Sequence, residues 1–283
     1  MTHTTTDVPG QLAALRDRLA LQRRLLVAFS GGVDSALVAV VAAQVLGAAS
    51  VAVTAVSASL PGAERAAARR FAVEHGLAHV EVCTDELDRP EYRANDGDRC
   101  FHCKSALLDA LRPLAEQSGA AIALGTNLDD LGDHRPGQRA AAARGAIAPL
   151  VEAGLGKDAV RAVSALLGLD TSAKPAAACL SSRVAYGDPV TREVLGRIER
   201  AEAALHALGF PVCRVRAHAG GTVARLELPP AELTRAGELG ARIDAEVRAA
   251  GFQFCSLDLQ GFRSGRMNVL LGIPALGGAA AGP

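Results

Sequence analysis

The chain has 283 residues, of which 49% are hydrophobic and 21% are charged, and 30 basic residues balance 30 acidic ones. This composition supplies enough apolar surface for a packed core and excludes a disordered chain. A neutral chain has no general field for polyanions, and no apolar stretch approaches the roughly 20 residues that cross a bilayer, so we expect neither a nucleic-acid partner nor a membrane.

The first residues, MTHTTTDVPGQ, are polar and contain no secretory signal, so we expect a cytoplasmic protein. Leucines at helical spacing then occupy residues 11–24. Short apolar strands are predicted at 25–29, 50–56, 79–83 and 120–124, with helices between them at 33–46, 61–75 and 103–117. The alternation predicts an α/β fold in which a parallel sheet has helices on both faces.

The second half of the chain has a different pattern. Loops rich in Gly, Pro, Ser and Asp surround a predicted helix at 157–167. From residue 191 the pattern predicts a helix at 192–209, a hairpin at 212–228 with a Gly-Gly turn, one helix at 230–251 and a strand at 254–262. We therefore predict an α/β domain with active-site loops over residues 1–185, and a smaller α+β domain for substrate binding or oligomerisation over residues 186–283.

The motif Ser30-Gly31-Gly32-Val33-Asp34-Ser35 lies between the first predicted strand and the helix after it. Glycines let the backbone approach an anion, and the N–H groups of a helix start donate hydrogen bonds to phosphate oxygens. Asp34 could hold a magnesium ion that bridges the phosphates. The alternative for such a string is an ordinary glycine turn with a helix cap.

This motif resembles the PP-loop of the ATP pyrophosphatase superfamily, which cleaves ATP between the α and β phosphates. The G-x-x-x-x-G-K-[ST] pattern of kinases and motors is absent from the sequence. Residues 154–159, GLGKDA, match the sequence pattern of a dinucleotide-binding fingerprint. No strand is predicted before them, so we interpret them as a helix start.

Further motifs follow in order: CFHCK at 100–104, GTN at 125–127, HRPG at 134–137 and KPAAACLSSR at 174–183. Together with the PP-loop they resemble the LarE family, the ATP-dependent sacrificial sulfur transferases of nickel-pincer nucleotide synthesis. The resemblance extends from about residue 11 to about residue 270. It implies a small-molecule substrate, a pyridinium dicarboxylate mononucleotide, one carboxylate of which is adenylated with ATP and converted to a thiocarboxylate. It also implies a homo-oligomer.

In that family a cysteine supplies the sulfur, and the matching residue is Cys179. Cleavage of its Cβ–S bond would leave dehydroalanine in the chain. The motif and the resemblance together assign ATP binding to Ser30, Gly31, Gly32, Asp34, Ser35, Gly125, Thr126 and Arg135. We assign substrate binding to Ser181, Ser182, Arg183, Glu202, Arg214 and Arg216, while Glu232 corresponds to another acidic position of the family.

Six cysteines are scattered along the chain, which indicates reduced thiols rather than a disulfide framework. Some relatives hold an iron–sulfur cluster with three clustered cysteines, but the loop at 174–183 contains Cys179 alone, so no cluster is expected. Cys213 and Cys255 lie on predicted strands and are expected in the core. Cys100 and Cys103 have half of a zinc pattern without a second half, which favours two reduced thiols.

The sequence is also compatible with other functions. Arg214 and Arg216 alternate on one predicted strand, so they share a face that could bind a phosphate or simply face solvent. The PP-loop would also suit a transfer-RNA thiolase or an amidotransferase, although no RNA-binding module or glutaminase domain is visible. A regulator that binds an adenine nucleotide without turnover is the non-enzymatic alternative.

Overall fold

The computed structural model describes residues 7–132, 137, 140–141, 143–175 and 178–263. Its contacts divide the chain into two compact units. The first unit contains Met1–Glu86 and Cys100–Ala177, and the second contains Leu87–Arg99 and Ala178–Pro283. The second unit therefore takes residues 87–99 and 178–185 from the part of the chain before the predicted boundary, while the functional division at residue 185 stays a prediction.

The first unit is built on a parallel four-stranded sheet of order β3-β2-β1-β4. The strands are β1 (Leu25–Ala28), β2 (Ser50–Val56), β3 (His79–Cys83) and β4 (Ala121–Ala123). All four were predicted from the apolar runs, and the predicted parallel arrangement is confirmed. Because β1 lies between β2 and β4, the residues after β1 come to the middle of the carboxyl edge, where open α/β sheets bind ligands.

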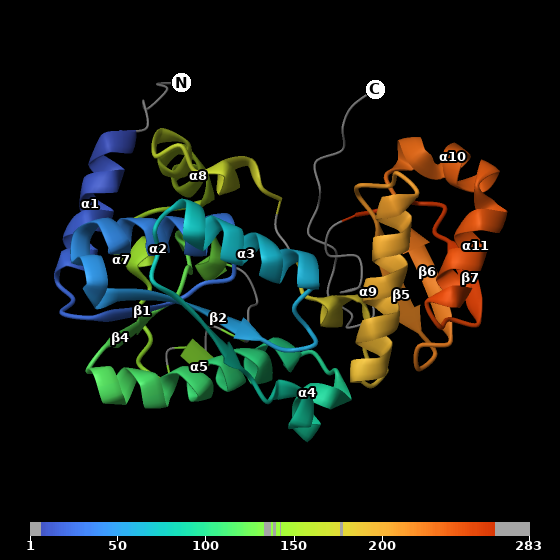
Figure 1. The fold of residues 1–283 in the computed structure, drawn as a ribbon, viewed down its shortest axis with the longest axis horizontal. Coiled ribbons are helices and arrows are strands. Elements are labelled where there is room, and N and C mark those ends of the chain that lie inside the picture. The colour runs from blue at the N-terminus through green and yellow to red at the C-terminus, as the bar shows by residue number, and fades with distance from the viewer. Residues whose placement is uncertain (1–6, 133–136, 138–139, 142, 176–177, 264–283) are drawn as a thin grey trace. The chain divides into compact units, whose positions relative to one another are not determined.

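Helices cover both faces of this sheet (Figure 1). One face carries α1 (Val8–Ala20), α2 (Val33–Leu46), α3 (Gly62–Glu74), α7 (Pro149–Glu152) and α8 (Lys157–Leu166), and the other carries α5 (Arg99–Ser118). Neighbouring residues of β1 alternate between them, since Val27 packs in the core with α2 while Leu26 packs with Leu111 of α5. Helix α2 consists almost entirely of Ala, Val and Leu because it is buried on nearly every side.

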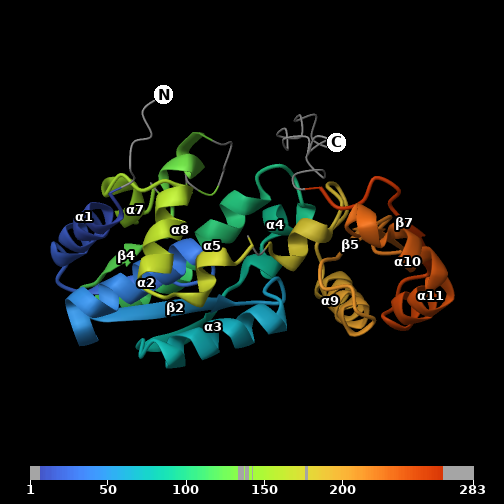
Figure 2. The same cartoon turned by 90° about the horizontal axis from the view of Figure 1, so that it is seen from above.

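The second unit contains a three-stranded sheet of order β5-β6-β7. Strands β5 (Arg214–His218) and β6 (Val223–Glu227) form the predicted antiparallel hairpin, and β7 (Phe254–Leu257) pairs parallel to β6. Gly220 and Gly221 both have positive φ, which explains the Gly-Gly pair in the turn. Helices α9 (Arg192–Ala207) and α11 (Gly240–Ala249) lie side by side on one face of this sheet (Figure 2).

The single helix predicted over 230–251 is wrong. This stretch forms a 3-10 turn, then α10 (Leu233–Glu238) and α11, with Leu239 between them in a non-helical conformation. Gly237 and Gly240 flank the break, and glycine is a weak helix former that disfavours one continuous helix. The described 3-10 helices are Gly47–Ala49, Glu86–Asp88, Leu128–Gly132, Asp170–Ala173, Leu180–Arg183 and Pro230–Glu232.

A short inner segment of the chain, residues 87–99, belongs to the second unit. It contains α4 (Pro90–Ala94), which ends at Asn95 in a left-handed conformation that asparagine tolerates. The fully buried Asn95 amide donates hydrogen bonds to the carbonyls of Ala185 (2.7 Å) and Asp188 (2.9 Å). This segment therefore holds the loop that follows Cys179. Among the residues described, no helix is both long and apolar enough to span a membrane.

Candidate functional site

The PP-loop residues lie between β1 and α2, at the carboxyl edge of the first sheet. Gly31 has φ of 71°, and a Cβ at this position would lie 3.3 Å from the Cβ of Ala68 on α3. A side chain here would be both strained and crowded. The first turn of α2 has no side-chain cap at Gly32, so its N–H groups can serve an external acceptor.

Ser35 organises the loop from inside. Its buried hydroxyl accepts a hydrogen bond from the N–H of Ser30 (3.2 Å) and donates one to the carbonyl of Gly32 (3.1 Å). The hydroxyl of Ser30 lies 3.1 Å from that of Ser35, on an exposed residue. Ser30 is therefore the serine of the motif whose side chain is accessible to a ligand, while Ser35 shapes the backbone.

Asp34 is held by two side chains from distant parts of the chain. The amide of Asn127 donates to one carboxylate oxygen at 3.0 Å, and the ammonium of Lys157 lies 2.6 Å from the other. Asn127 is itself buried, and its amide oxygen accepts from the N–H of Asp129 at 3.0 Å. The carboxylate that was predicted as a magnesium ligand thus already lies beside a cation.

Gly125 follows β4 and packs against the start of α2. A Cβ on Gly125 would lie 2.7 Å from the backbone nitrogen of Ser35, which is closer than real Cβ contacts. Glycine is therefore required where the backbone after β4 approaches the backbone of the PP-loop, and Gly125 packs directly against that loop. Thr126, next to it, is half-buried. Arg135, the remaining predicted ATP ligand, lies outside the described residues.

Lys174 provides a further contact to the loop. Its ammonium donates to the carbonyl of Gly31 at 3.0 Å and pairs with Glu64 of α3 at 2.7 Å. Arg161 of α8 donates to the carbonyls of Ser172 and Lys174, so α8 fixes the backbone of the same segment. The start of the predicted cysteine loop is thereby tied to the PP-loop within the first unit.

The residues predicted around the sulfur donor lie in the second unit. Cys179 is exposed and precedes the 3-10 turn Leu180–Arg183. Its carbonyl accepts hydrogen bonds from the hydroxyl of Ser182 (2.7 Å) and the guanidinium of Arg183 (2.9 Å). The backbone of this cysteine is therefore fixed while its thiol faces outward.

Ser181 and Arg183, both predicted to bind substrate, are buried within this unit. The hydroxyl of Ser181 lies 2.7 Å from the phenol oxygen of Tyr92, and Arg99 donates to its carbonyl. Arg183 pairs through two nitrogens with Glu202 at 3.0 and 3.2 Å. The geometry gives these residues a role in holding the loop, and Glu202 also accepts from the backbone N–H of Val215.

Arg214 and Arg216 differ in their partners. The buried Arg216 pairs with Glu227 at 2.7 Å and donates to the carbonyl of Ser182. Arg214 forms no ion pair with any residue that the structure describes, and its guanidinium stacks 5.2 Å from the ring of Phe262. Burial, together with the charge of Arg183, lowers the pKa of Arg214 from its usual value. An anion beside Arg214 would relieve this repulsion, as expected for a binding residue.

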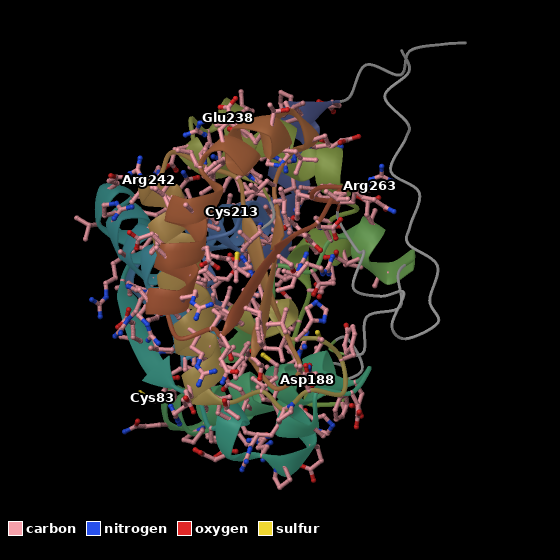
Figure 3. The ribbon with its side chains drawn as sticks, turned by 90° about the vertical axis from the view of Figure 1, so that its right-hand side faces the viewer. Cys83, Asp188, Cys213, Glu238, Arg242 and Arg263 are labelled. Carbon is pink, nitrogen blue, oxygen red and sulfur yellow. The ribbon has the colours of Figure 1, made fainter. Side chains whose placement is uncertain are left out.

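The remaining cysteines have distinct surroundings. Cys213, labelled in Figure 3, is fully buried, and burial raises the pKa of its thiol to about 12. Cys255, which was also expected in the core, is only half-buried, and this partial burial raises the pKa of its thiol to about 11. Cys100 is exposed and Cys103 is half-buried near the start of α5. The described residues contain no cluster of three or more side chains suited to a metal ion.

Sequence reasoning missed three residues that contact the PP-loop: Asn127, Lys157 and Lys174. Each lies within a motif that was noticed, but their contacts join residues more than 90 positions apart. The prediction that residues 154–159 form a helix start is confirmed, because α8 begins at Lys157. Glu232 pairs with Arg235 at 3.0 Å.

Comparisons with known proteins agree with this geometry. The sequence model of the asparagine synthase family matches residues 12–92, which include the PP-loop. The chain is 38% identical to the pyridinium-3,5-bisthiocarboxylic acid mononucleotide synthase of Lactiplantibacillus plantarum, over 91% of this chain and 92% of that protein. It is also 44% identical to an uncharacterized protein of Synechocystis sp., over 93% of this chain and 98% of that one. An uncharacterized protein of Methanocaldococcus jannaschii is 23% identical over 86% of this chain and 92% of its own length.

Proposed function

Because this chain belongs to the LarE family, we propose that it is an ATP-dependent sulfur transferase for nickel-pincer cofactor synthesis. Its substrate is a pyridinium dicarboxylate mononucleotide, and its product carries a thiocarboxylate. The sulfur comes from Cys179. The observation that carries the proposal is the exposed Cys179 on a backbone fixed by hydrogen bonds, in a chain that also contains a complete PP-loop.

The ATP half of the reaction belongs to the first unit. The helix start at Gly32 and the exposed Ser30 hydroxyl supply donors for phosphate oxygens. A substrate carboxylate attacks the α phosphorus, and the bond to the leaving pyrophosphate breaks. The resulting acyl adenylate is a far better electrophile than the carboxylate, which makes attack by a thiolate feasible.

The residues around the loop fit a magnesium ion that is bound mainly through phosphates. Asp34 offers a carboxylate that is 22% exposed, but the ammonium of Lys157 already balances its charge, so phosphate oxygens would supply most of the negative charge around the ion. One carboxylate together with phosphate oxygens and water is the usual coordination of magnesium on a nucleotide. When bound, the ion would offset the negative charge of the pyrophosphate.

The sulfur half of the reaction belongs to the second unit. The thiolate of Cys179 attacks the acyl carbon, AMP leaves with the electron pair of the C–O bond, and a thioester joins protein and substrate. Removal of the Cα proton of Cys179 then breaks its Cβ–S bond, and the sulfur keeps that electron pair as a thiocarboxylate. The cysteine becomes dehydroalanine, so each chain donates one sulfur atom.

Arg214 is the residue of this unit best placed to bind an anionic group of the substrate. Its charge is not neutralised by any described carboxylate, whereas Arg183 and Arg216 each pair with a buried glutamate. This division of roles narrows the substrate-binding prediction. Arg214 binds the substrate, and the other two arginines hold the loop and the strand.

Mass spectrometry after incubation with ATP, magnesium and the pyridinium dicarboxylate mononucleotide tests the proposal. The expected result is the loss of one hydrogen sulfide equivalent at Cys179 and the release of pyrophosphate. Cys179→Ala should release pyrophosphate without forming sulfurated product. Cys83→Ala is the matched control, because Cys83 is also an exposed free thiol and lies in the first unit.

An intact Cys179 in the presence of sulfurated product would point to an external sulfur source. An intact Cys179 without product would contradict the proposed substrate. Release of pyrophosphate only with another acceptor would favour a different PP-loop enzyme. The homo-oligomeric state and the cytoplasmic location stay predictions, and analytical ultracentrifugation tests the first of them.

A further inference from the structure

The geometry points to Lys157 as a phosphate-binding residue that contacts the β and γ phosphates of ATP and stabilises the departing pyrophosphate. This inference rests on the proposed function, because it assigns a role within the same ATP site. The PP-loop contains no lysine, unlike the G-x-x-x-x-G-K-[ST] loop. Instead, a lysine from a helix more than 120 residues later in the chain brings its ammonium beside Asp34 of the PP-loop.

The position of Lys157 is fixed by its backbone. It is the first residue of α8, and its N–H donates to the carboxylate of Asp129. A Cβ on the preceding Gly156 would lie 3.0 Å from the same carboxylate, so only glycine fits there without displacing it. Further along α8, Val160 and Val163 are fully buried in the core of the first unit. The backbone that carries the Lys157 side chain is therefore held in place.

The charges around Lys157 favour an anion. Its ammonium lies 2.6 Å from Asp34, a residue in the first turn of α2, where the helix dipole is positive. A cation beside a helix N-terminus is unfavourable unless negative charge is present, and a single carboxylate only balances the lysine. The N–H groups of the helix start, which no side chain caps at Gly32, and the lysine together leave an excess of positive potential at this point of the loop.

Lys157 also remains accessible, since 34% of its side chain is exposed. Lys174, the other lysine near the loop, is occupied by Glu64 and by the carbonyl of Gly31. An ammonium has three donors, and only one is directed at Asp34 by a described contact. Lys157 can therefore bind a phosphate oxygen while it keeps its contact to Asp34.

The chemistry of adenylation gives this contact a use. When the substrate carboxylate oxygen bonds to the α phosphorus, the bond from that phosphorus to the bridging oxygen breaks. The electron pair leaves with the pyrophosphate, so negative charge grows on the leaving group. A fixed ammonium stabilises that charge more than the charge of the ground state, which is how preorganised cations lower barriers. The step needs no separate proton acceptor and no oxidant or reductant.

A double-mutant cycle separates this role from simple neutralisation of Asp34. The variants are Lys157→Met, which keeps the length of the side chain, Asp34→Asn, and the two combined. The measurement is the Kd of α,β-methylene ATP by calorimetry without divalent metal, with adenosine as the matched ligand that lacks phosphates. Circular dichroism checks that each variant is folded, and Lys157→Arg tests rescue of the charge.

If Lys157 binds phosphate, Lys157→Met raises the Kd of the triphosphate about tenfold, as expected for one lost charge-assisted hydrogen bond. The same factor appears in the Asp34→Asn background, adenosine binding stays unchanged, and Lys157→Arg recovers part of the loss. If Lys157 only neutralises Asp34, its substitution has no effect once Asp34 is an asparagine. That result, or an equal loss of adenosine binding, overturns the inference.

The two proposals fail separately. A wild-type chain that binds the triphosphate through Lys157 but never loses sulfur from Cys179 contradicts the proposed function alone. Sulfur transfer that proceeds with an unchanged triphosphate Kd in Lys157→Met contradicts only the role of the lysine. A wild-type chain that does not bind the triphosphate contradicts both.

Discussion

Replacing Arg183 by lysine keeps the charge of a buried side chain but removes the geometry of its hydrogen bonds. The guanidinium donates to Glu202 at 3.0 and 3.2 Å, and to the carbonyls of Ala178 at 2.6 Å and Cys179 at 2.9 Å. An ammonium cannot reach both the glutamate and the carbonyls, so at least two charge-assisted bonds are lost. At about 1.5 kcal/mol each, the loss of stability is about 3 kcal/mol.

Two assays report on this variant. Hydrogen exchange should show faster exchange at the amides of residues 182 and 184, whose bonds define the turn after Cys179. Single-turnover mass spectrometry should show slower sulfur loss from Cys179, with a smaller effect on pyrophosphate release. Arg192→Lys is the matched control, because Arg192 is 64% exposed in the same unit and its nearest carboxylate is 3.7 Å away.

The opposite division of effects would refute the reasoning. If Arg183→Lys raises only the Kd of the mononucleotide substrate, while exchange and the rate of sulfur loss stay at wild-type values, then Arg183 contacts the substrate. The loop would in that case be held by other residues.

Three further outcomes can be checked directly. Gly125→Ala places a Cβ 2.7 Å from a backbone nitrogen of α2, so it should lower the free energy of unfolding by roughly 1–3 kcal/mol and weaken ATP binding. Wild-type affinity for ATP, measured by calorimetry, would contradict the close approach. Iodoacetamide at pH 8 should leave Cys213 unmodified in the folded protein and modify Cys255 more slowly than the exposed Cys83, since burial raises their pKa values to about 12 and about 11. Labelling of Cys213 before unfolding, or equal rates at Cys255 and Cys83, would contradict the raised pKa values. The hydrogen bond from Arg65, first among several, lowers the pKa of Glu81 to about 2, so Glu81→Gln should lower the melting temperature at pH 7. That difference should shrink as the pH falls from about 4.5 to about 2, because protonation of Glu81 then removes the same stabilisation, and a constant difference would contradict the linkage.

The sequence predicted the first unit well because β1, β2 and β4 are short apolar runs that are followed within two residues by serine or glycine. The predicted helix over 33–46 and the strands over 50–56 and 79–83 have the bounds observed. Burial on both faces makes such strands continuous in hydrophobicity, and this signal is local. The position of the PP-loop at the carboxyl edge followed directly from that order.

The sequence could not predict which polar residues pair. Ser181 lies in a polar loop and suggests exposure, yet it is fully buried against Tyr92. The partner lies 89 positions away, and no periodicity links the two. The partner of Arg183 was equally unpredictable. It is Glu202 of α9, and the pattern of that helix predicts only which of its faces is apolar. Long-range polar contacts of this kind decide which residues of a motif remain free for a ligand.

The discontinuous course of the chain has a consequence for anyone who divides this protein into pieces. Residues 87–99 leave the first unit, contribute Asn95 and Tyr92 to the support of the cysteine loop, and return. A fragment that starts at residue 178 would contain Cys179 without the segment that supports its loop. Expression of the second unit by itself would therefore require a circular permutation or a graft of residues 87–99. A gene fusion that exchanges only the C-terminal half would combine residues 87–99 of one protein with the cysteine loop of another.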